Sequence, residues 1–149
     1  MRHDQIVCSI PTYTTEDSAI RLPICGNYDY WTALTHYFLP KANTIEIHCW
    51  NEEIETIKDV EVLFKDKKYE GNLTIFRGEN DFALTDYLLK AHLNRSGEFK
   101  WFTVNLDMDT SSVFHSGHWG TELFVPNATE RDIAFIKSVI PDETIIVQY

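Results

Sequence analysis

The sequence has no apolar run long enough to cross a membrane and no apolar stretch close to its N-terminus. A membrane-spanning helix needs about 20 mostly apolar residues, and a secretory signal needs an apolar core of about 7 to 15. The three cysteines, Cys8, Cys25 and Cys49, are scattered and form no Cys-x-x-Cys pair. An odd, scattered set is typical of reduced thiols rather than of a disulfide framework. These absences predict a cytoplasmic protein.

Motifs of nucleotide and nucleophilic chemistry are also missing. Only six glycines occur, and none belongs to a Gly-x-Gly-x-x-Gly or Gly-x-x-x-x-Gly-Lys-Ser/Thr phosphate loop. Ser116-Gly117 is not part of a Gly-x-Ser-x-Gly elbow. Cys49 shares its alternation with Ile45 and Ile47, which predicts a buried, inert thiol. We therefore expect a binding protein without a cofactor rather than an enzyme.

Positive charge is scarce, with 13 Lys and Arg against 23 Asp and Glu and a formal net charge of −10. Phosphate binding needs clustered Lys and Arg, so direct binding to nucleic acid is disfavoured. An acidic field attracts basic partners and speeds their encounter. The other interpretation of the same charge is a solubility coat.

The length of 149 residues fits a single domain, and no linker or internal repeat divides the chain. Helices are predicted over about 28–38, 81–94 and 129–140. Asn27, Asn80 and Thr129 are their expected caps, and Thr129 and Asp132 have the spacing of a capping box.

Strands are predicted between these helices, where apolar and polar residues alternate. We expect them at 6–10, 45–50, 60–64, 69–76, 99–106 and 121–125, with Val113-Phe114 as a possible part of the last, and a buried strand at 144–147. Asp66-Lys67 is expected to form a hairpin turn, and Gly71 a bulge. Strands that follow one another as hairpins predict an α+β fold, a largely antiparallel sheet with about three helices packed on it.

One segment could carry metal chemistry. His115, His118 and Glu122 lie within eight residues, and imidazole and carboxylate groups both suit Zn²⁺. However, His-x-x-His does not align on one face of a strand. The alternatives are a glycine-kinked loop with Trp119 packed on the core, or a binding loop.

In size, acidity, aromatic content and lack of a catalytic motif, the chain resembles the small immunity proteins of contact-dependent growth inhibition and related polymorphic toxin systems. The resemblance implies a protein that binds a cognate toxin domain, often a basic nuclease, and covers its active site. Acidic side chains would then steer the encounter, namely Glu52, Glu53, Glu55, Asp107 and Asp109. Trp50 and Trp119 would anchor the interface.

Two further functions stay open at this level. One is a small metal-assisted hydrolase centred on His115, His118 and Glu122. The other is a phage-type inhibitor of a host nuclease. Trp50 itself has two interpretations, because it points outward if only one sheet face is covered and lies in the core if helices cover both faces.

Overall fold

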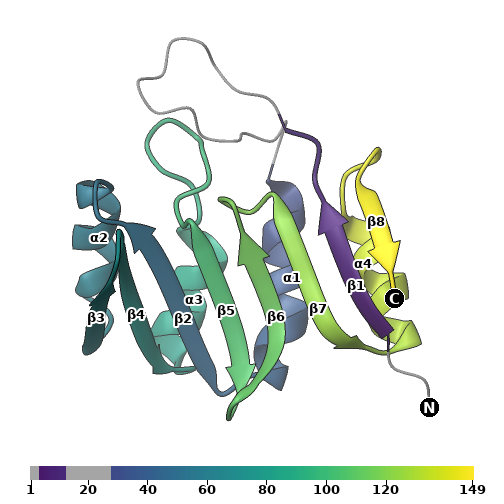
Figure 1. The fold of residues 1–149 in the computed structure, drawn as a ribbon, viewed down its shortest axis with the longest axis horizontal. Helices are drawn as coiled ribbons and strands as arrows, with labels where there is room; N and C mark the ends of the chain where they lie inside the picture. The colour runs from purple at the N-terminus through teal and green to yellow at the C-terminus, as the bar shows by residue number, and fades with distance from the viewer. Residues whose placement is uncertain (1–3, 13–27) are drawn as a thin grey trace.

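The computed structural model describes residues 4–12 and 28–149, which form an antiparallel sheet with helices packed behind one of its faces (Figure 1). The strands in this part of the chain are β1 (Asp4–Ser9), β2 (Thr44–Trp50), β3 (Asp66–Glu70), β4 (Leu73–Glu79), β5 (Thr103–Met108), β6 (Ser111–Gly117), β7 (Glu122–Ala128) and β8 (Ile145–Gln148). The helices are α1 (Asp29–Phe38), α2 (Ile54–Glu61), α3 (Phe82–Lys90) and α4 (Glu130–Val139), with a short 3-10 helix, η1 (Leu39–Lys41).

The eight strands follow the spatial order β3-β4-β2-β5-β6-β7-β1-β8, and every neighbouring pair is antiparallel. The predicted α+β class is thereby confirmed, with four α-helices among the described residues instead of about three. β3 and β8 form the two edges of the sheet.

β2 shows how alternation in the sequence selects the faces of the sheet. Ile45, Ile47 and Cys49 are fully buried toward the helices, whereas Glu46 and His48 lie on the opposite face. The predicted burial of the Cys49 thiol is confirmed, and this burial raises its pKa to about 12.

Helices α3 and α4 begin at side-chain caps. The Thr129 hydroxyl accepts from the Asp132 backbone N–H, and the Asp132 carboxylate accepts from the Thr129 N–H, so the predicted capping box is present. The cap of α3 is Asp81, which accepts from the Leu84 N–H, rather than the predicted Asn80. Asn80 instead donates to the carbonyl groups of Leu39 and Ala42. The predicted cap of α1, Asn27, lies outside the described residues.

The strand predicted at 60–64 is wrong, because residues 54–61 form α2. Ile57, Val60 and Phe64 have the spacing of a helix face, and all three pack on the core. Over so few residues, a run of apolar side chains fits both a strand and a helix.

The predicted turn at Asp66-Lys67 is also wrong. These residues begin the edge strand β3, and the hairpin turns at Gly71-Asn72, where Gly71 has a φ of +60° that glycine adopts without strain. The charges of this segment protect a sheet edge instead of a turn.

Two further boundaries and the burial of one strand differ from the predictions. Residues 99–102 precede β5 instead of belonging to it, and Val113 and Phe114 lie in a strand of their own, β6. β8, predicted to be buried, is an exposed edge strand in which Ile145 is 66% exposed.

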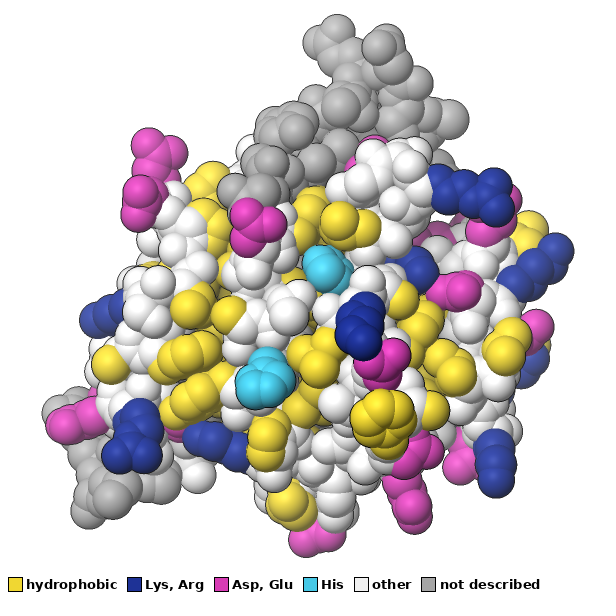
Figure 2. Space-filling view, turned by 180° about the vertical axis from the view of Figure 1, so that it is seen from behind, with side chains coloured by type: hydrophobic (Ala, Val, Ile, Leu, Met, Phe, Trp, Pro, Cys, Tyr) yellow, Lys and Arg dark blue, Asp and Glu magenta, His cyan; other side chains and the backbone are white. Residues whose placement is uncertain are grey.

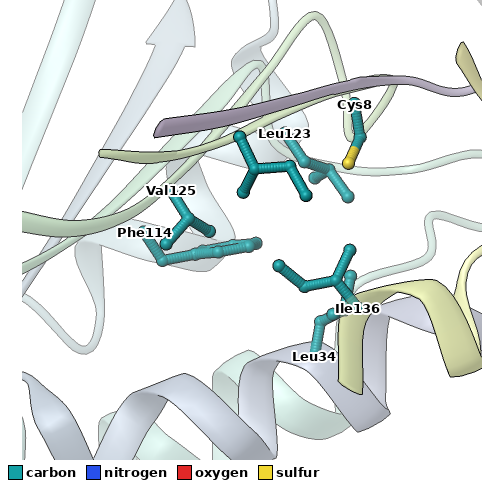
Figure 3. A pocket seen from close by; sticks show the side chains of 7 residues that line it. Cys8, Leu34, Phe114, Leu123, Val125 and Ile136 are labelled. Carbon is teal, nitrogen blue, oxygen red and sulfur yellow. The ribbon is translucent and has the colours of Figure 1, made fainter. Parts of the chain in front are cut away.

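Aromatic and aliphatic side chains fill the space between the sheet and the helices. Trp31 of α1 packs edge-on against Phe99, with ring centroids 4.8 Å apart, and lies close to Trp101 and Phe114. Figure 3 shows the neighbouring part of the core, where side chains from β1, β6 and β7 point toward Leu34 and Ile136 of α1 and α4. The packing there leaves no space for a water molecule.

Candidate functional site

The sheet face turned away from the helices is the candidate site, because the described helices lie on the other face (Figure 1). We call it the open face. Strand pairing aligns one row of open-face residues across all eight strands, running Val147, Val7, Phe124, His115, Asn105, Glu46, Arg77, Asp66. The row is apolar from β8 to β7 and polar from β6 to β3.

Glu46 is the centre of the polar half. Its Oε1 accepts a hydrogen bond from His48 Nε2 at 2.6 Å, and its Oε2 accepts from Arg77 Nη1 at 2.9 Å. Partial burial alone would raise the pKa of Glu46, but the hydrogen bonds from His48 and Arg77 outweigh it and hold this pKa below its ordinary value. Arg77 also reaches Asp107 Oδ2 at 3.4 Å, which joins β4 to β5 across β2.

Asn105 extends this network to β6 and selects the tautomer of His115. The Asn105 amide nitrogen faces Glu46 Oε1 at 3.4 Å, so its amide oxygen faces His115 Nδ1 at 2.6 Å. A carbonyl oxygen only accepts, so His115 donates through Nδ1 and carries its lone pair on Nε2. Burial, with a smaller contribution from nearby His48, lowers the pKa of His115 and so favours the neutral ring.

Gly117 leaves room for this ring on the same strand. A Cβ atom built at Gly117 would lie 3.0 Å from His115 Nε2, closer than ordinary van der Waals contact. The imidazole of His115 therefore lies over Gly117, and a larger residue at this position would require the ring to shift.

An aromatic cluster lies at the end of the open face where β2 finishes. Phe102 packs edge-on against both Trp50 and Trp119, with ring centroids 5.2 and 4.8 Å apart, and His118 stacks on it at 6.0 Å. The four side chains Trp50, Phe102, His118 and Trp119 are called the aromatic cluster below.

Glu53 ties the two tryptophans together. Its carboxylate accepts from the Trp50 backbone N–H at 3.1 Å and from Trp119 Nε1 at 3.2 Å. Burial raises the pKa of Glu53 above its ordinary value, although the hydrogen bonds from Trp50 and Trp119 act in the opposite direction. The buried indole N–H of Trp50 finds no acceptor among the described residues.

The predicted partner-binding residues separate into two groups. Trp50, Glu53 and Trp119 meet in and beside the aromatic cluster. Asp107 pairs with Thr44 at the other end of β2, six residues away, which is about 20 Å at the ordinary rise of a strand. Trp50 is half-buried on the open face.

The remaining three predicted carboxylates take no part in the network around Glu46. Asp109 lies in the β5–β6 turn with a φ of +55° and accepts from the Asn43 side chain. Glu52 and Glu55 are exposed beside the start of α2.

The predicted metal ligands do not converge. His115 turns toward Asn105, whereas His118 lies beyond the end of β6 with its Nδ1 3.4 Å from Glu122 Oε1. Within residues 4–12 and 28–149, no group of three His, Cys, Asp or Glu side chains is placed to hold a metal ion.

Glu46, His48, Arg77 and Asn105 were not among the predicted site residues. Alternation alone places Glu46 and His48 on the face opposite Ile45 and Ile47, so this signal was available in the sequence. Their contacts with Arg77 and Asn105 depend on the pairing of β2 with β4 and β5, which no local pattern encodes.

Negative charge predominates among the strand residues that strand pairing assigns to the open face. Two of the charged side chains are cationic, Lys68 and Arg77. Six are carboxylates: Glu46, Asp66, Glu70, Glu79, Asp107 and Glu122. The helix side also carries basic and acidic side chains, interspersed with hydrophobic ones (Figure 2).

No described helix has both the length and the apolar character needed to span a membrane. Comparison of the chain with known protein families, with curated proteins and with solved structures found no significant match. The arguments about function therefore rest on the geometry of the open face.

Proposed function

We propose that the chain is an immunity-type protein that binds a basic protein domain on its open face and blocks that domain sterically. The observation that carries this proposal is the combination of a predominantly negative sheet face, which no described helix covers, with an aromatic cluster at one end. Aromatic anchors beside charged rims are typical of protein interfaces.

The two parts of the surface have different roles in the proposal. Exposed carboxylates such as Glu122 and Glu79 attract a cationic domain and raise the rate of encounter, an effect that falls as salt screens the charges. The aromatic cluster then supplies desolvated contact area, which governs the rate of dissociation. A toxin domain with nuclease activity has the required chemistry, because its own substrate is a polyanion.

The hypothesis of an enzyme has less support. The three residues on which it was based, His115, His118 and Glu122, form no common site. The histidine network around Glu46 instead connects neighbouring strands of the open face.

The test takes as partner a basic domain encoded beside the gene for this chain and measures its binding rates at low and high salt. The variant Asp107→Asn with Glu122→Gln removes two open-face charges. Its matched control, Asp86→Asn with Glu130→Gln, removes one Asp and one Glu from the exposed surfaces of α3 and α4. Asp86 is ion-paired with Lys90, as Asp107 is with Arg77, so the two Asp→Asn substitutions lose similar local contacts.

We expect the association rate constant to fall by about tenfold for the open-face variant and to change less than about twofold for the control. The difference should vanish at about 0.5 M salt. Failure of the basic domain to bind, or equal effects of the two variants, would contradict the proposal.

A further inference from the structure

The two edges of the sheet are built differently. β3 presents four charged residues among its five, Asp66, Lys67, Lys68 and Glu70, and charges of this kind discourage strand pairing. β8 carries none, and within the described residues it pairs only with β1. Its side chains Ile145 and Val147, together with the adjoining Tyr149, are 66%, 42% and 69% exposed. An uncharged edge with exposed apolar side chains is a template for another strand.

The hydrogen bonds to β1 show which backbone groups of β8 remain available. Tyr149 and Gln5 exchange both backbone hydrogen bonds, so they form a hydrogen-bonded pair. In an antiparallel ladder such pairs alternate, so Val147 and Ile145 also face β1. The N–H and C=O groups of Ile146 and Gln148 consequently point to the free edge.

We infer that this edge pairs with β8 of a second copy of the chain, about a two-fold axis at Val147, and joins the two sheets into one. In this register Ile146 pairs with Gln148 of the other copy. The N–H and C=O groups of both residues, four groups in each copy, then all form hydrogen bonds between the two strands. Val147 meets its own equivalent, and Ile145 meets Tyr149 of the other copy. The three exposed apolar side chains thus cover one another, and such cross-strand pairs stabilise a sheet.

Two features select this register and this occupant. A register centred on Ile146 would require the backbone of Thr144, whose N–H already donates to the Pro141 carbonyl. In a register shifted by one residue, Val147 would pair with Ile146 or Gln148 of the other copy. Directly paired residues lie on the same face of a sheet, so the open faces of the two copies would then point to opposite sides. A cationic partner strand gains nothing here, since residues 145–149 carry no charged side chain.

The joined sheet would also continue the apolar half of the open face. Val147 is aligned with Val7 and Phe124 in the row that crosses the sheet. Pairing of two β8 strands would place the apolar halves of both copies side by side, with the two polar halves at the outer ends.

Sedimentation velocity over a range of concentrations tests the dimer. We expect a concentration-dependent species of twice the 17.4 kDa chain mass. Val147→Lys would oppose two ammonium groups across the axis and abolish this species. The matched control Tyr69→Lys adds the same charge at the β3 edge, where Tyr69 is 70% exposed, and should leave the dimer intact.

A cysteine pair tests the register without depending on the folding of the lysine variant. Opposed residues of a non-hydrogen-bonded pair lie about 4.5 Å apart between Cα atoms, within the range of a disulfide. In a Cys25→Ser background, Val147→Cys should therefore cross-link to itself on oxidation, whereas Gln148→Cys, which faces Ile146, should not.

The salt dependence of binding distinguishes self-association from binding of a basic partner. Two copies that each carry −10 repel, so dimerisation should strengthen between about 0.05 and 0.5 M salt, whereas binding of a basic domain should weaken. A chain that stays monomeric at about 100 µM in high salt would overturn the inference. So would a dimer that survives Val147→Lys, or equal cross-linking of the two cysteine variants.

Discussion

At the scale of single residues, Asp132 connects three parts of the helical layer. Asp132 is 4% exposed, and its carboxylate accepts from Tyr37 of α1 at 2.7 Å, from Lys41 of η1 at 2.8 Å and from the Thr129 backbone at 2.9 Å. Burial alone would raise the pKa of Asp132, but these hydrogen bonds outweigh it and lower the pKa to about 2.

Asp132→Asn should therefore lower the free energy of unfolding at pH 7 by about 2 kcal/mol. A carboxyl whose pKa is depressed by folding stabilises the protein above its unfolded pKa, near 3.8, and this contribution is lost as the pH falls toward about 2. Denaturant unfolding of both proteins between pH 7 and pH 2 measures the difference, which should shrink over the lower part of this range.

The control for this prediction is Glu130→Gln, which removes an exposed carboxylate from the same first turn of α4. We expect its unfolding free energy to change by less than about 0.5 kcal/mol. A difference between wild type and Asp132→Asn that is constant across the pH range would show that charge is not its cause.

At the scale of elements, α1 is held by two buried hydrogen bonds as well as by apolar packing. The Tyr30 hydroxyl donates to the Gly120 carbonyl at 2.6 Å, and Trp31 Nε1 donates to the Leu88 carbonyl at 2.9 Å. The first contact joins α1 to the turn between β6 and β7, directly after Trp119 of the aromatic cluster. The position of α1 thus supports one end of the open face.

Tyr30→Phe should lower the free energy of unfolding by about 1 to 2 kcal/mol, because it leaves the buried Gly120 carbonyl without this donor. The matched control is Tyr69→Phe, since Tyr69 is exposed on the edge strand β3, and its effect should be close to zero. Chemical denaturation measures both effects. Equal effects of the two variants would contradict the role assigned to the Tyr30 hydroxyl.

Elements also differ in how well the sequence predicts them. The capping box at Thr129 and the alternation of β2 are local signals, and both are present in the structure. α2 and β3 were assigned wrongly because a short apolar run fits two periodicities and a charged run fits a turn or an edge strand.

At the scale of the whole molecule, one sheet connects residues 4–9 with the C-terminal strand. β1 lies between β7 and β8, so segments far apart in the sequence share one ladder. The buried hydrophobic residues between the sheet and the helices also form one contiguous cluster. Neither the ladder nor the core divides into independent parts.

We therefore predict a single cooperative unfolding transition for the chain. The calorimetric and van't Hoff enthalpies should agree, and circular dichroism and tryptophan fluorescence should report the same midpoint. The measurement belongs at low protein concentration, where the proposed dimer is dissociated. Two separate transitions would contradict the prediction of a single domain.

Local chemistry in the sequence was sufficient for several features of this protein. The α+β class, the capping box of α4, the buried state of Cys49 and the excess of negative charge all follow from residue types and their spacing. These features depend on neighbours within a few positions along the chain, which a periodic pattern records directly.

Long-range strand pairing decided the rest. The order of the strands left one face open, brought Arg77 and Asn105 to Glu46, and placed an uncharged β8 at the edge of the sheet. Register is set by how complete strands bury their apolar faces together, so it involves partners that are dozens of residues apart. For this reason neither the network around Glu46 nor the contact of Glu53 with Trp119, 66 residues away, could be predicted from local patterns.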